Sequence, residues 1–201
     1  LGPSAHRRPK PAMPRLVQRQ EILGLEAYEQ RRPAIQQRVL FEKARRRVHL
    51  GPDLTFLFEN AETVRYQVQE MLRIEKRSDE GSVLHELSTY NELIGGPGEL
   101  GCTLLIEIDD PRERERKLSA WLDLPKHLYL RCQDGARIAA KYDPRQVGER
   151  RVSSVHYLKF AVGARTPVAL GCDLPGFGPE GRGLEVALSA AQQSALVEDL
   201  R

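Results

Sequence analysis

The sequence predicts an α+β fold: an amino-terminal helical half with a helical hairpin, packed on a mainly antiparallel β-sheet, and a carboxy-terminal helix. Two patterns predict it. Apolar residues recur at helical spacing through residues 61–94, and they alternate with polar residues at strand spacing in segments before and after. The dipeptide Asp134-Gly135 adds a hairpin turn between two later strands. A chain of 201 residues, 40% apolar and 29% charged, is long and apolar enough to bury a core.

The first residues have the composition of a tail. Four prolines precede residue 15, and they exclude a helix of any length there. Residues 1–50 hold 12 Lys and Arg against 4 Asp and Glu, a net charge of +8, whereas the whole chain carries only +3. We therefore expect a flexible basic tail over residues 1–19, with the natural chain beginning near Met13, and a single α+β domain over residues 20–201.

A basic helix follows the tail. Residues 21–28 fit a short helix, and Pro33 then opens a stronger one, because proline is tolerated in a first turn. Its carboxyl end is rich in arginine, which suits the negative end of the helix dipole. The same cluster could bind an anion such as a nucleic-acid phosphate, so both readings stay open. The candidate anion-binding residues are Arg38, Arg45, Arg46 and Arg47.

A turn, a strand and a helix come next, in direct succession. Gly51-Pro52-Asp53 predicts the turn, and residues 54–59 alternate as a strand. Asn60 is a suitable N-cap, since its side-chain oxygen can accept from free amides of the first turn. The helix that starts at residue 61 has an apolar stripe made of Ala61, Val64, Val68, Met71 and Leu72.

Glu75 continues that apolar stripe. With Val64 at zero on a helical wheel, Glu75 falls at about 20° and Gln67 at about −60°. An unpaired carboxylate buried there would cost several kcal/mol or become protonated. Glu75 is therefore either buried with partners or placed beyond the helix end in solvent, and the sequence leaves both possibilities open.

A second helix is predicted from the break at residues 78–82 to about Leu93. Glu86 and Tyr90 are four residues apart on it and share a side. An antiparallel hairpin of the two helices would bring Glu75, Glu86 and Tyr90 together. The glycine-rich segment at residues 95–99 lacks the Lys-Ser/Thr ending of a phosphate-binding loop.

The second half of the chain reads mainly as strands. Residues 112–122 are the exception, a short charged helix, and residues 175–183 form a loop long enough to act as a lid. His156 shares the apolar side of its strand, where a histidine is more often a core residue than a ligand or base. The predicted strands cover residues 102–108, 128–132, 138–142, 152–162 and 166–172, and a helix covers residues 184–200.

No motif identifies a reaction. The zincin, ferritin-like and serine-hydrolase signatures are missing from the sequence, as is any C-x-x-C pair. Scattered carboxylates remain, at residues 59, 70, 75, 86, 99 and 107, and oxygen-rich clusters with one histidine can hold manganese or iron. The candidate polar site is Gln67, Glu70, Glu75, Glu86, Tyr90 and His156.

The cysteines and the hydropathy bear on location. Cys102, Cys132 and Cys172 are odd in number and widely spaced, which favours reduced thiols and a cytoplasmic setting. No apolar run approaches the roughly 20 residues of a membrane span. The sequence identifies no cofactor and no oligomeric state.

Three blocks carry a family resemblance. They are RRRVHLGPDLTFLFENAETVRYQVQEMLRIEK, ELSTYNELIGGPGELGCTLLIEI and SSVHYLKF, and they resemble the bacterial family catalogued as domain of unknown function 3501. The resemblance covers most of the chain from about residue 20. Members look like small single-domain proteins, often encoded near rubrerythrin-like proteins and iron–sulfur oxidoreductases. The resemblance implies, by association, a redox or iron-handling partner protein, and it implies no catalytic residues.

Three functional hypotheses follow. The first is an accessory or binding protein that acts with an iron or redox partner, through the basic helix and the Glu/Tyr hairpin. The second is a carboxylate-rich metal protein or enzyme that uses Glu75, Glu86, Tyr90 and His156. The third, which the mixed charges elsewhere disfavour, is nucleic-acid binding through the basic arm and helix at residues 5–47.

Overall fold

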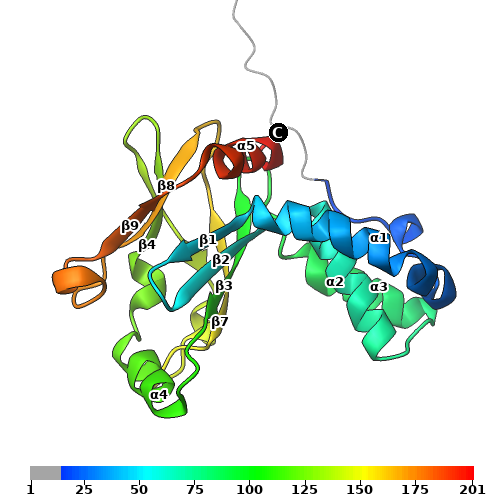
Figure 1. The fold of residues 1–201 in the computed structure, drawn as a ribbon, viewed down its shortest axis with the longest axis horizontal. Helices are drawn as coiled ribbons and strands as arrows, with labels where there is room; N and C mark the ends of the chain where they lie inside the picture. The colour runs from blue at the N-terminus through cyan, green and yellow to red at the C-terminus, as the bar shows by residue number, and fades with distance from the viewer. Residues whose placement is uncertain (1–14) are drawn as a thin grey trace, which may run out of the picture.

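The computed structural model describes residues 15–201 and confirms the α+β class (Figure 1). Helices α1, α2 and α3 lie together on one side of the β-strands, whereas α4 and α5 lie at opposite ends of them. The helices are α1 (Leu25–Ala44), α2 (Ala61–Ile74), α3 (Glu80–Asn91), α4 (Pro111–Ala120) and α5 (Ala190–Asp199). The strands are β1 (Arg47–Leu50), β2 (Leu54–Glu59), β3 (Leu100–Ile106), β4 (Leu128–Cys132), β5 (Arg137–Ala139), β6 (Lys141–Tyr142), β7 (Val155–Phe160), β8 (Pro167–Cys172) and β9 (Leu184–Ala187).

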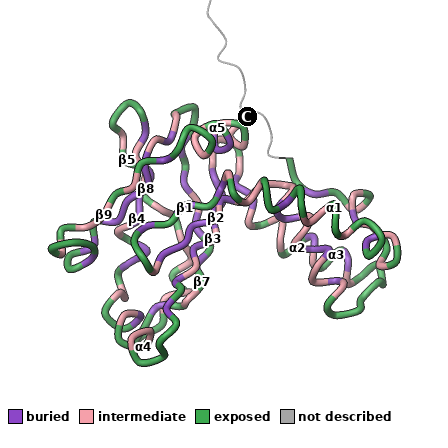
Figure 2. The backbone as a smooth tube through the Cα atoms, in the orientation of Figure 1, coloured by how far each residue is buried: buried purple, intermediate pink, exposed green. Residues whose placement is uncertain are grey.

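The strands form two antiparallel sheets. The order is β1-β2-β3-β7-β6 in the five-stranded sheet and β5-β4-β8-β9 in the four-stranded sheet. Side chains from both sheets enter one hydrophobic cluster, which includes Phe56, Phe58, Leu130 and Phe160. Figure 2 shows the buried residues running along the strands. We call this part of the chain the β region.

The helical hairpin has a separate interior. Val64, Val68 and Leu72 of α2 pack with Val83 and Leu87 of α3 in a second hydrophobic cluster. Asn60 caps α2 as predicted, because its side chain accepts from the Thr63 amide at 3.0 Å. The hairpin prediction is confirmed by the packing of α2 on α3. Helices α1, α2 and α3 with residues 15–24 are called the helical region below.

The amino-terminal segment departs from the predicted tail. The prediction for residues 1–14 lies outside the described residues. The backbone of Val17, however, is bound through its N–H and C=O to the Asn91 side chain, each at 3.0 Å, and the Val17 side chain is buried. Residues 15–19 therefore lie against α3 because one amide side chain satisfies both polar groups of an extended residue.

Helix α1 corrects two expectations. It runs unbroken from Leu25 to Ala44 with Pro33 inside it, on an exposed position, rather than beginning at Pro33. It also ends before Arg47, which belongs to β1 and pairs with Leu57 of β2. Helix α1 packs along α2, and these tertiary contacts outweigh the local helix-breaking effect of the proline.

Two later elements also differ from the sequence patterns. The predicted strand at residues 138–142 divides, with β5 paired to β4 and β6 paired to β7 of the other sheet. Residues 184–187, predicted as the start of the last helix, form β9 against β8. Helix α5 starts at Ala190, where Ser189 caps it by accepting from the Gln192 amide. In both segments, backbone hydrogen bonding to a neighbouring strand determines the secondary structure.

Two further findings bear on the setting of the chain. Within residues 15–201, no helix has both the length and the apolar character to cross a bilayer. Cys102, Cys132 and Cys172 are free and buried, so the described structure contains no disulfide among them.

Candidate functional site

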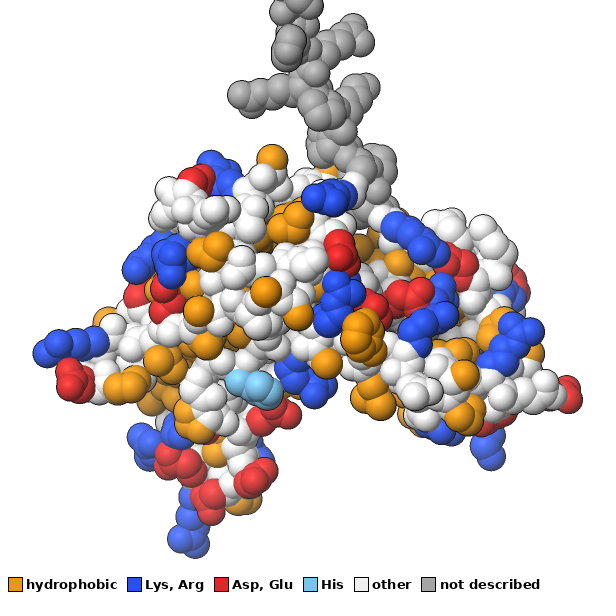
Figure 3. All heavy atoms as spheres, turned by 45° about the horizontal axis from the view of Figure 1, so that its top comes forward, with side chains coloured by type: hydrophobic (Ala, Val, Ile, Leu, Met, Phe, Trp, Pro, Cys, Tyr) orange, Lys and Arg blue, Asp and Glu red, His pale blue; other side chains and the backbone are white. Residues whose placement is uncertain are grey.

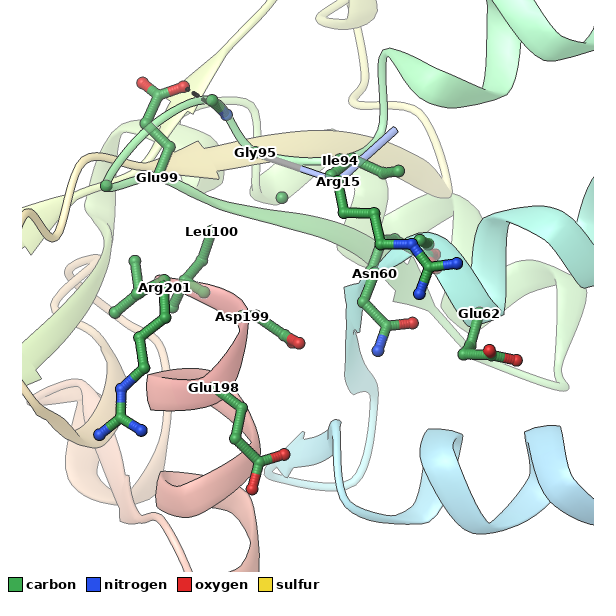
Figure 4. A pocket seen from close by; sticks show the side chains of 16 residues that line it. Arg15, Asn60, Glu62, Ile94, Gly95, Glu99, Leu100, Glu198, Asp199 and Arg201 are labelled. Atoms are coloured by element: carbon green, nitrogen blue, oxygen red, sulfur yellow. Dashed lines mark hydrogen bonds between the residues drawn. The ribbon is translucent and has the colours of Figure 1, made fainter. Parts of the chain in front are cut away.

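A cavity of about 290 Å³ lies where the helical region meets the β region (Figure 4). We call it the junction cavity. The end of β2, the start of α2, the glycine-rich loop before β3 and the end of α5 surround it, and Figure 4 shows Asp199 and Asn60 extending toward one another across it. Its polar lining residues are Arg15, Glu59, Asn60, Glu62, Glu99, Glu198, Asp199 and Arg201.

Glu59 is the most deeply placed carboxylate of this cavity. Thr63 donates its hydroxyl to Oε2 of Glu59 at 2.5 Å, and Thr103 donates to Oε1 at 2.9 Å. The side chain of Glu59 leaves the last residue of β2, so the strand end and the first turn of α2 fix its position. Both oxygens are therefore held by neutral hydroxyl donors.

Glu59 has no ion-pair partner among residues 15–201. Burial raises the pKa of its carboxyl, although the hydroxyls of Thr63 and Thr103 and the charges of Lys43 and Arg46 act in the opposite direction. A desolvated carboxylate without a counter-ion is stabilised either by a proton or by a cation brought from outside. The Glu59 side chain therefore needs either a proton or a cation from a bound ligand.

The other buried carboxylate, Asp199, is already neutralised. Arg46, which is only 2% exposed, donates to both oxygens of Asp199 at 2.8 Å and also to Glu42. Burial raises the pKa of Asp199, and hydrogen bonds from Arg46 and Asn60 oppose that rise. The pair joins the end of α1 to the end of α5, so it fixes the wall of the cavity.

The glycine-rich loop gives the cavity its floor. A side chain on Gly101 would meet the Leu93 carbonyl oxygen at 1.8 Å, and one on Gly95 would meet the Glu99 carbonyl oxygen at 2.1 Å. These two positions admit glycine only, because backbone atoms pass too closely. Glu99 leaves the loop toward Lys141, with which it pairs at 2.9 Å. The loop serves close backbone packing and not phosphate binding.

Four of the six predicted polar-site residues lie near one another. The Gln67 amide is within hydrogen-bonding reach of the Tyr90 hydroxyl, and the charges of Glu86 and Glu75 are close enough to act on Tyr90. Burial raises the pKa of Tyr90, and both carboxylates add to that rise. Glu75 itself caps the end of α2, is 36% exposed and pairs with Arg77 at 3.1 Å. It therefore lies at the helix end, in solvent.

Glu70, the fifth predicted residue, joins α1 to α2. Arg32 donates to both of its oxygens at 2.8 and 3.0 Å, and Tyr28 donates its hydroxyl at 2.6 Å. The Arg32 guanidinium is the largest influence that lowers the pKa of Glu70, to about 2. Three side chains, those of Tyr28, Arg32 and Arg73, hold this carboxylate, which points to a structural role.

His156, the sixth, lies apart from the others. Tyr157 faces the helical region, so the preceding residue faces the opposite side of the sheet and enters the core. His156 is fully buried, and neither ring nitrogen has a hydrogen-bond partner among the described residues. Burial lowers the pKa of the His156 ring. It does not join the Glu/Tyr group.

The predicted anion-binding arginines are mostly engaged within the chain. Arg38 pairs with Glu62 at 3.1 Å, Arg45 with Glu198 at 3.0 Å, and Arg46 with Asp199. Arg47 is exposed on β1. Figure 3 shows acidic and basic side chains interspersed over this face rather than a patch of one sign. Such mixed surfaces give weak attraction for polyanions.

A carboxylate metal site finds no support in the arrangement of these residues. Across residues 15–201, no group of three or more His, Cys, Asp or Glu side chains is placed to hold a metal ion. The Glu/Tyr group lacks a third ligand because Glu70 and His156 are elsewhere.

The sequence patterns did not select the residues of the junction cavity. Glu59 was only one of the scattered carboxylates in the sequence. Its position between a buried strand and the N-cap residue Asn60 was the one local indication that its side chain is fixed in place. Thr103 and Asp199 carried no local signal, since they reach Glu59 and Arg46 from far along the chain.

Comparisons with known proteins agree with the resemblance in the sequence. The family described as protein of unknown function DUF3501 matches residues 16–200. The chain belongs to this family. A crystal structure of a novel protein of unknown function from Burkholderia pseudomallei is 30% identical, with a TM-score of 0.81 over 93% of this chain and 100% of that one. No curated protein matches the chain.

The DUF3501 blocks have a common location in the fold. Residues 59–62 come from the first block and residues 94–101 from the second, and both line the junction cavity. Two of the three blocks that carry the family resemblance therefore meet at this cavity. This coincidence makes the cavity the candidate site of the chain.

Proposed function

We propose that this DUF3501 protein is a binding protein, and that the junction cavity holds a small ligand through a protonated nitrogen placed against Glu59. The observation that carries the proposal is the Glu59 carboxylate, which is partly buried, fixed by two threonine hydroxyls and not paired with any cation of residues 15–201. An ammonium or guanidinium group would supply the missing charge and further hydrogen bonds.

The surroundings favour a small ligand with one cationic group. A cavity of about 290 Å³ is at the lower end of ligand sites, which suits a compact amine rather than a large cofactor. The neighbouring carboxylates Glu62, Glu99 and Glu198 are each paired with a basic residue, so they add little net attraction. Selectivity would therefore come from Glu59.

Calorimetric titration with butylamine, putrescine and agmatine tests the proposal, with butanol and butyrate as neutral and anionic controls. We expect at least one amine to bind and the two controls not to bind. Glu59→Gln should weaken amine binding at least tenfold, because the carbonyl oxygen lacks the charge. Glu198→Gln is the matched control, since Glu198 lines the same cavity but pairs with Arg45 in a more exposed position.

The pH dependence provides a second criterion. The pKa of the Glu59 carboxyl is raised. The group is protonated and neutral at pH values below this pKa and ionised at pH values above it. Alkyl amines stay protonated to about pH 10. Binding should therefore strengthen as the pH rises above the ordinary value of 4.5 in the natural sequence and change little in Glu59→Gln. Equal binding of butanol, or amine binding that Glu59→Gln leaves intact, would overturn the proposal.

A partner protein is the second part of the proposal. The family resemblance implies a redox or iron-handling partner, and a binding protein is compatible with an accessory role. Affinity purification from cells that also produce a rubrerythrin-like protein tests this part. We expect the partner to be retained in the natural chain, and a clean isolated protein in native conditions would count against the accessory role.

A further inference from the structure

A second hollow of about 480 Å³ lies between the end of α3 and the strands β6 and β7. We call it the tyrosine groove, because Tyr90, Tyr142 and Tyr157 line it from three different elements. It is separate from the junction cavity, with which it shares no lining residue. Gln146 closes one end, where its side-chain oxygen accepts from the Tyr157 amide at 3.0 Å.

Tyr157 is the ring most open to the groove, at 47% exposed. Tyr90 and Tyr142 are half-buried, and they pack against the hydrophobic clusters of the helical region and the β region while lining the groove. The hydroxyls of Tyr142 and Tyr157 have no hydrogen-bond partner among the described residues. Tyrosines of this kind offer a flat apolar surface and a free hydrogen-bond donor, a combination frequent at binding sites.

One cation of the groove is free. Lys141 and Lys159 are opposite each other on β6 and β7, so their side chains leave the same face of the sheet. Lys141 pairs with Glu99 at 2.9 Å, whereas Lys159 forms no ion pair within residues 15–201. Asp143 is neutralised by Arg145, and Glu92 is exposed on the α3 side of the groove. The β7 side is therefore the positive side.

We propose that the tyrosine groove binds a ligand that combines an aromatic ring with an anionic group, with the ring against Tyr157 and the anion at Lys159. Stacking of a ring on an aromatic side chain is favourable for many different rings, because every aromatic ring has a flat π-face. The free ammonium and the phenol hydroxyls provide donors to carboxylate or phosphate oxygens. Glu92 would oppose a second negative charge on the other side, which favours compact anions.

Two sources share this chemistry, a nucleoside monophosphate and an aromatic carboxylate. The groove volume accommodates either. Fluorescence-detected titration with adenosine 5′-monophosphate and with 4-hydroxybenzoate distinguishes them, and adenosine and inorganic phosphate test the ring and the anion separately. We expect one of the two complete ligands to bind at least tenfold more tightly than adenosine or phosphate.

Two variants test the residues. Lys159→Met keeps the length of the side chain and removes its charge, and Tyr157→Ala removes the exposed ring. Each should weaken the bound ligand at least tenfold. Lys126→Met is the matched control, because Lys126 is an exposed lysine that pairs with Asp123 and does not line the groove. Circular dichroism of each variant should match that of the natural sequence, since Tyr157 and Lys159 lie outside the core.

Several results would overturn the proposal. They are no binding of either aromatic anion at millimolar concentration, equal binding of phosphate alone, or full binding by both Lys159→Met and Tyr157→Ala. The amine titrations of the junction cavity remain interpretable in each case, because the two sites share no lining residue and take ligands of opposite charge.

Discussion

The helical region and the β region are stabilised by different kinds of contact. The interior of the β region is apolar and contains large aromatic side chains, with Phe58 and Phe160 in contact at a ring separation of 6.1 Å. The interior of the helical region consists mainly of valine and leucine, and ionic and amide contacts such as those of Glu70 and Gln69 hold its helices together. The β region is therefore the more robust scaffold against changes of pH and salt.

This difference explains where the junction cavity lies. Polar groups that bind ligands need rigid support on one side and freedom to be solvated on the other. Glu59 is at the last position of a core strand, while its partner Thr63 is in the first turn of the polar-contact helix α2. The cavity thus lies at the boundary between the two types of packing. The Arg46–Asp199 ion pair forms part of its wall by joining the end of α1 to the end of α5.

Phe58→Ala should have the largest effect on stability. Removing a fully buried phenylalanine costs about 3–5 kcal/mol, as lost transfer free energy plus a cavity. Val68→Ala in the helical region removes less volume and should cost about 2 kcal/mol. Urea unfolding measures both. Equal losses would contradict the view that the β region contains the principal core.

Arg46→Met tests the joint between the two regions. It leaves the partly buried Asp199 without its cation, so we expect a loss of about 3 kcal/mol. Arg45→Met is the matched control, because its pair with Glu198 is more exposed and should contribute about 0–1 kcal/mol. The double variant Arg46→Met/Asp199→Leu should recover part of the loss in a double-mutant cycle. Additive effects would show that the pair is not coupled.

Glu70→Gln tests the pH sensitivity of the helical region. The folded-state pKa of Glu70 is about 2, below its ordinary value of 4.5, so the ionised group stabilises the fold above about pH 4.5 and the effect is lost as pH falls toward 2. At pH 7 the substitution should cost about 2 kcal/mol, less than the full pKa difference gives, because Arg32 and Arg73 are partly in water.

Urea unfolding from pH 2.5 to pH 7 measures this effect. The difference between Glu70→Gln and the natural sequence should shrink steadily below pH 4.5. Glu29→Gln is the control, since Glu29 is exposed and lies 3.7 Å from Arg73. A difference that does not change with pH would mean that the Glu70 contacts are not electrostatic.

Local patterns were sufficient for the elements that local rules determine. The strand at residues 54–59, the Asn60 cap and the α2–α3 hairpin follow from alternation, capping chemistry and helical periodicity, and the structure has all three. Pro33 and residues 184–187 show the limit, because contacts with α2 and with β8 override the local preference there. No local pattern encodes which sheet a short strand such as β6 joins.

The site was less predictable than the fold for the same reason. Helical spacing placed Gln67 near Glu75 on one helix and Glu86 near Tyr90 on the next, and the predicted hairpin brought the two helices together. In the structure the charges of Glu75 and Glu86 act on Tyr90. The environment of Glu59 includes a hydrogen bond from Thr103 and the charges of Lys43 and Arg46, and none of these residues is a neighbour of Glu59 in the sequence. Likewise, the strand pattern placed His156 on an apolar face but could not show that the opposite face meets the helices.

Glu75→Ala should have the smallest effect, and it contrasts the carboxylate at the end of α2 with Glu70 inside the helix. Glu75 is at the helix end and pairs only with the exposed Arg77, so its loss should change the free energy of unfolding by less than about 0.5 kcal/mol. Glu75 contributes to the raised pKa of Tyr90, so the substitution should lower that pKa in an ultraviolet titration. Glu86→Ala should lower it more, because the Glu86 charge acts more strongly on Tyr90. A loss of stability as large as that of Glu70→Gln would show that the end of α2 is held as firmly as its middle.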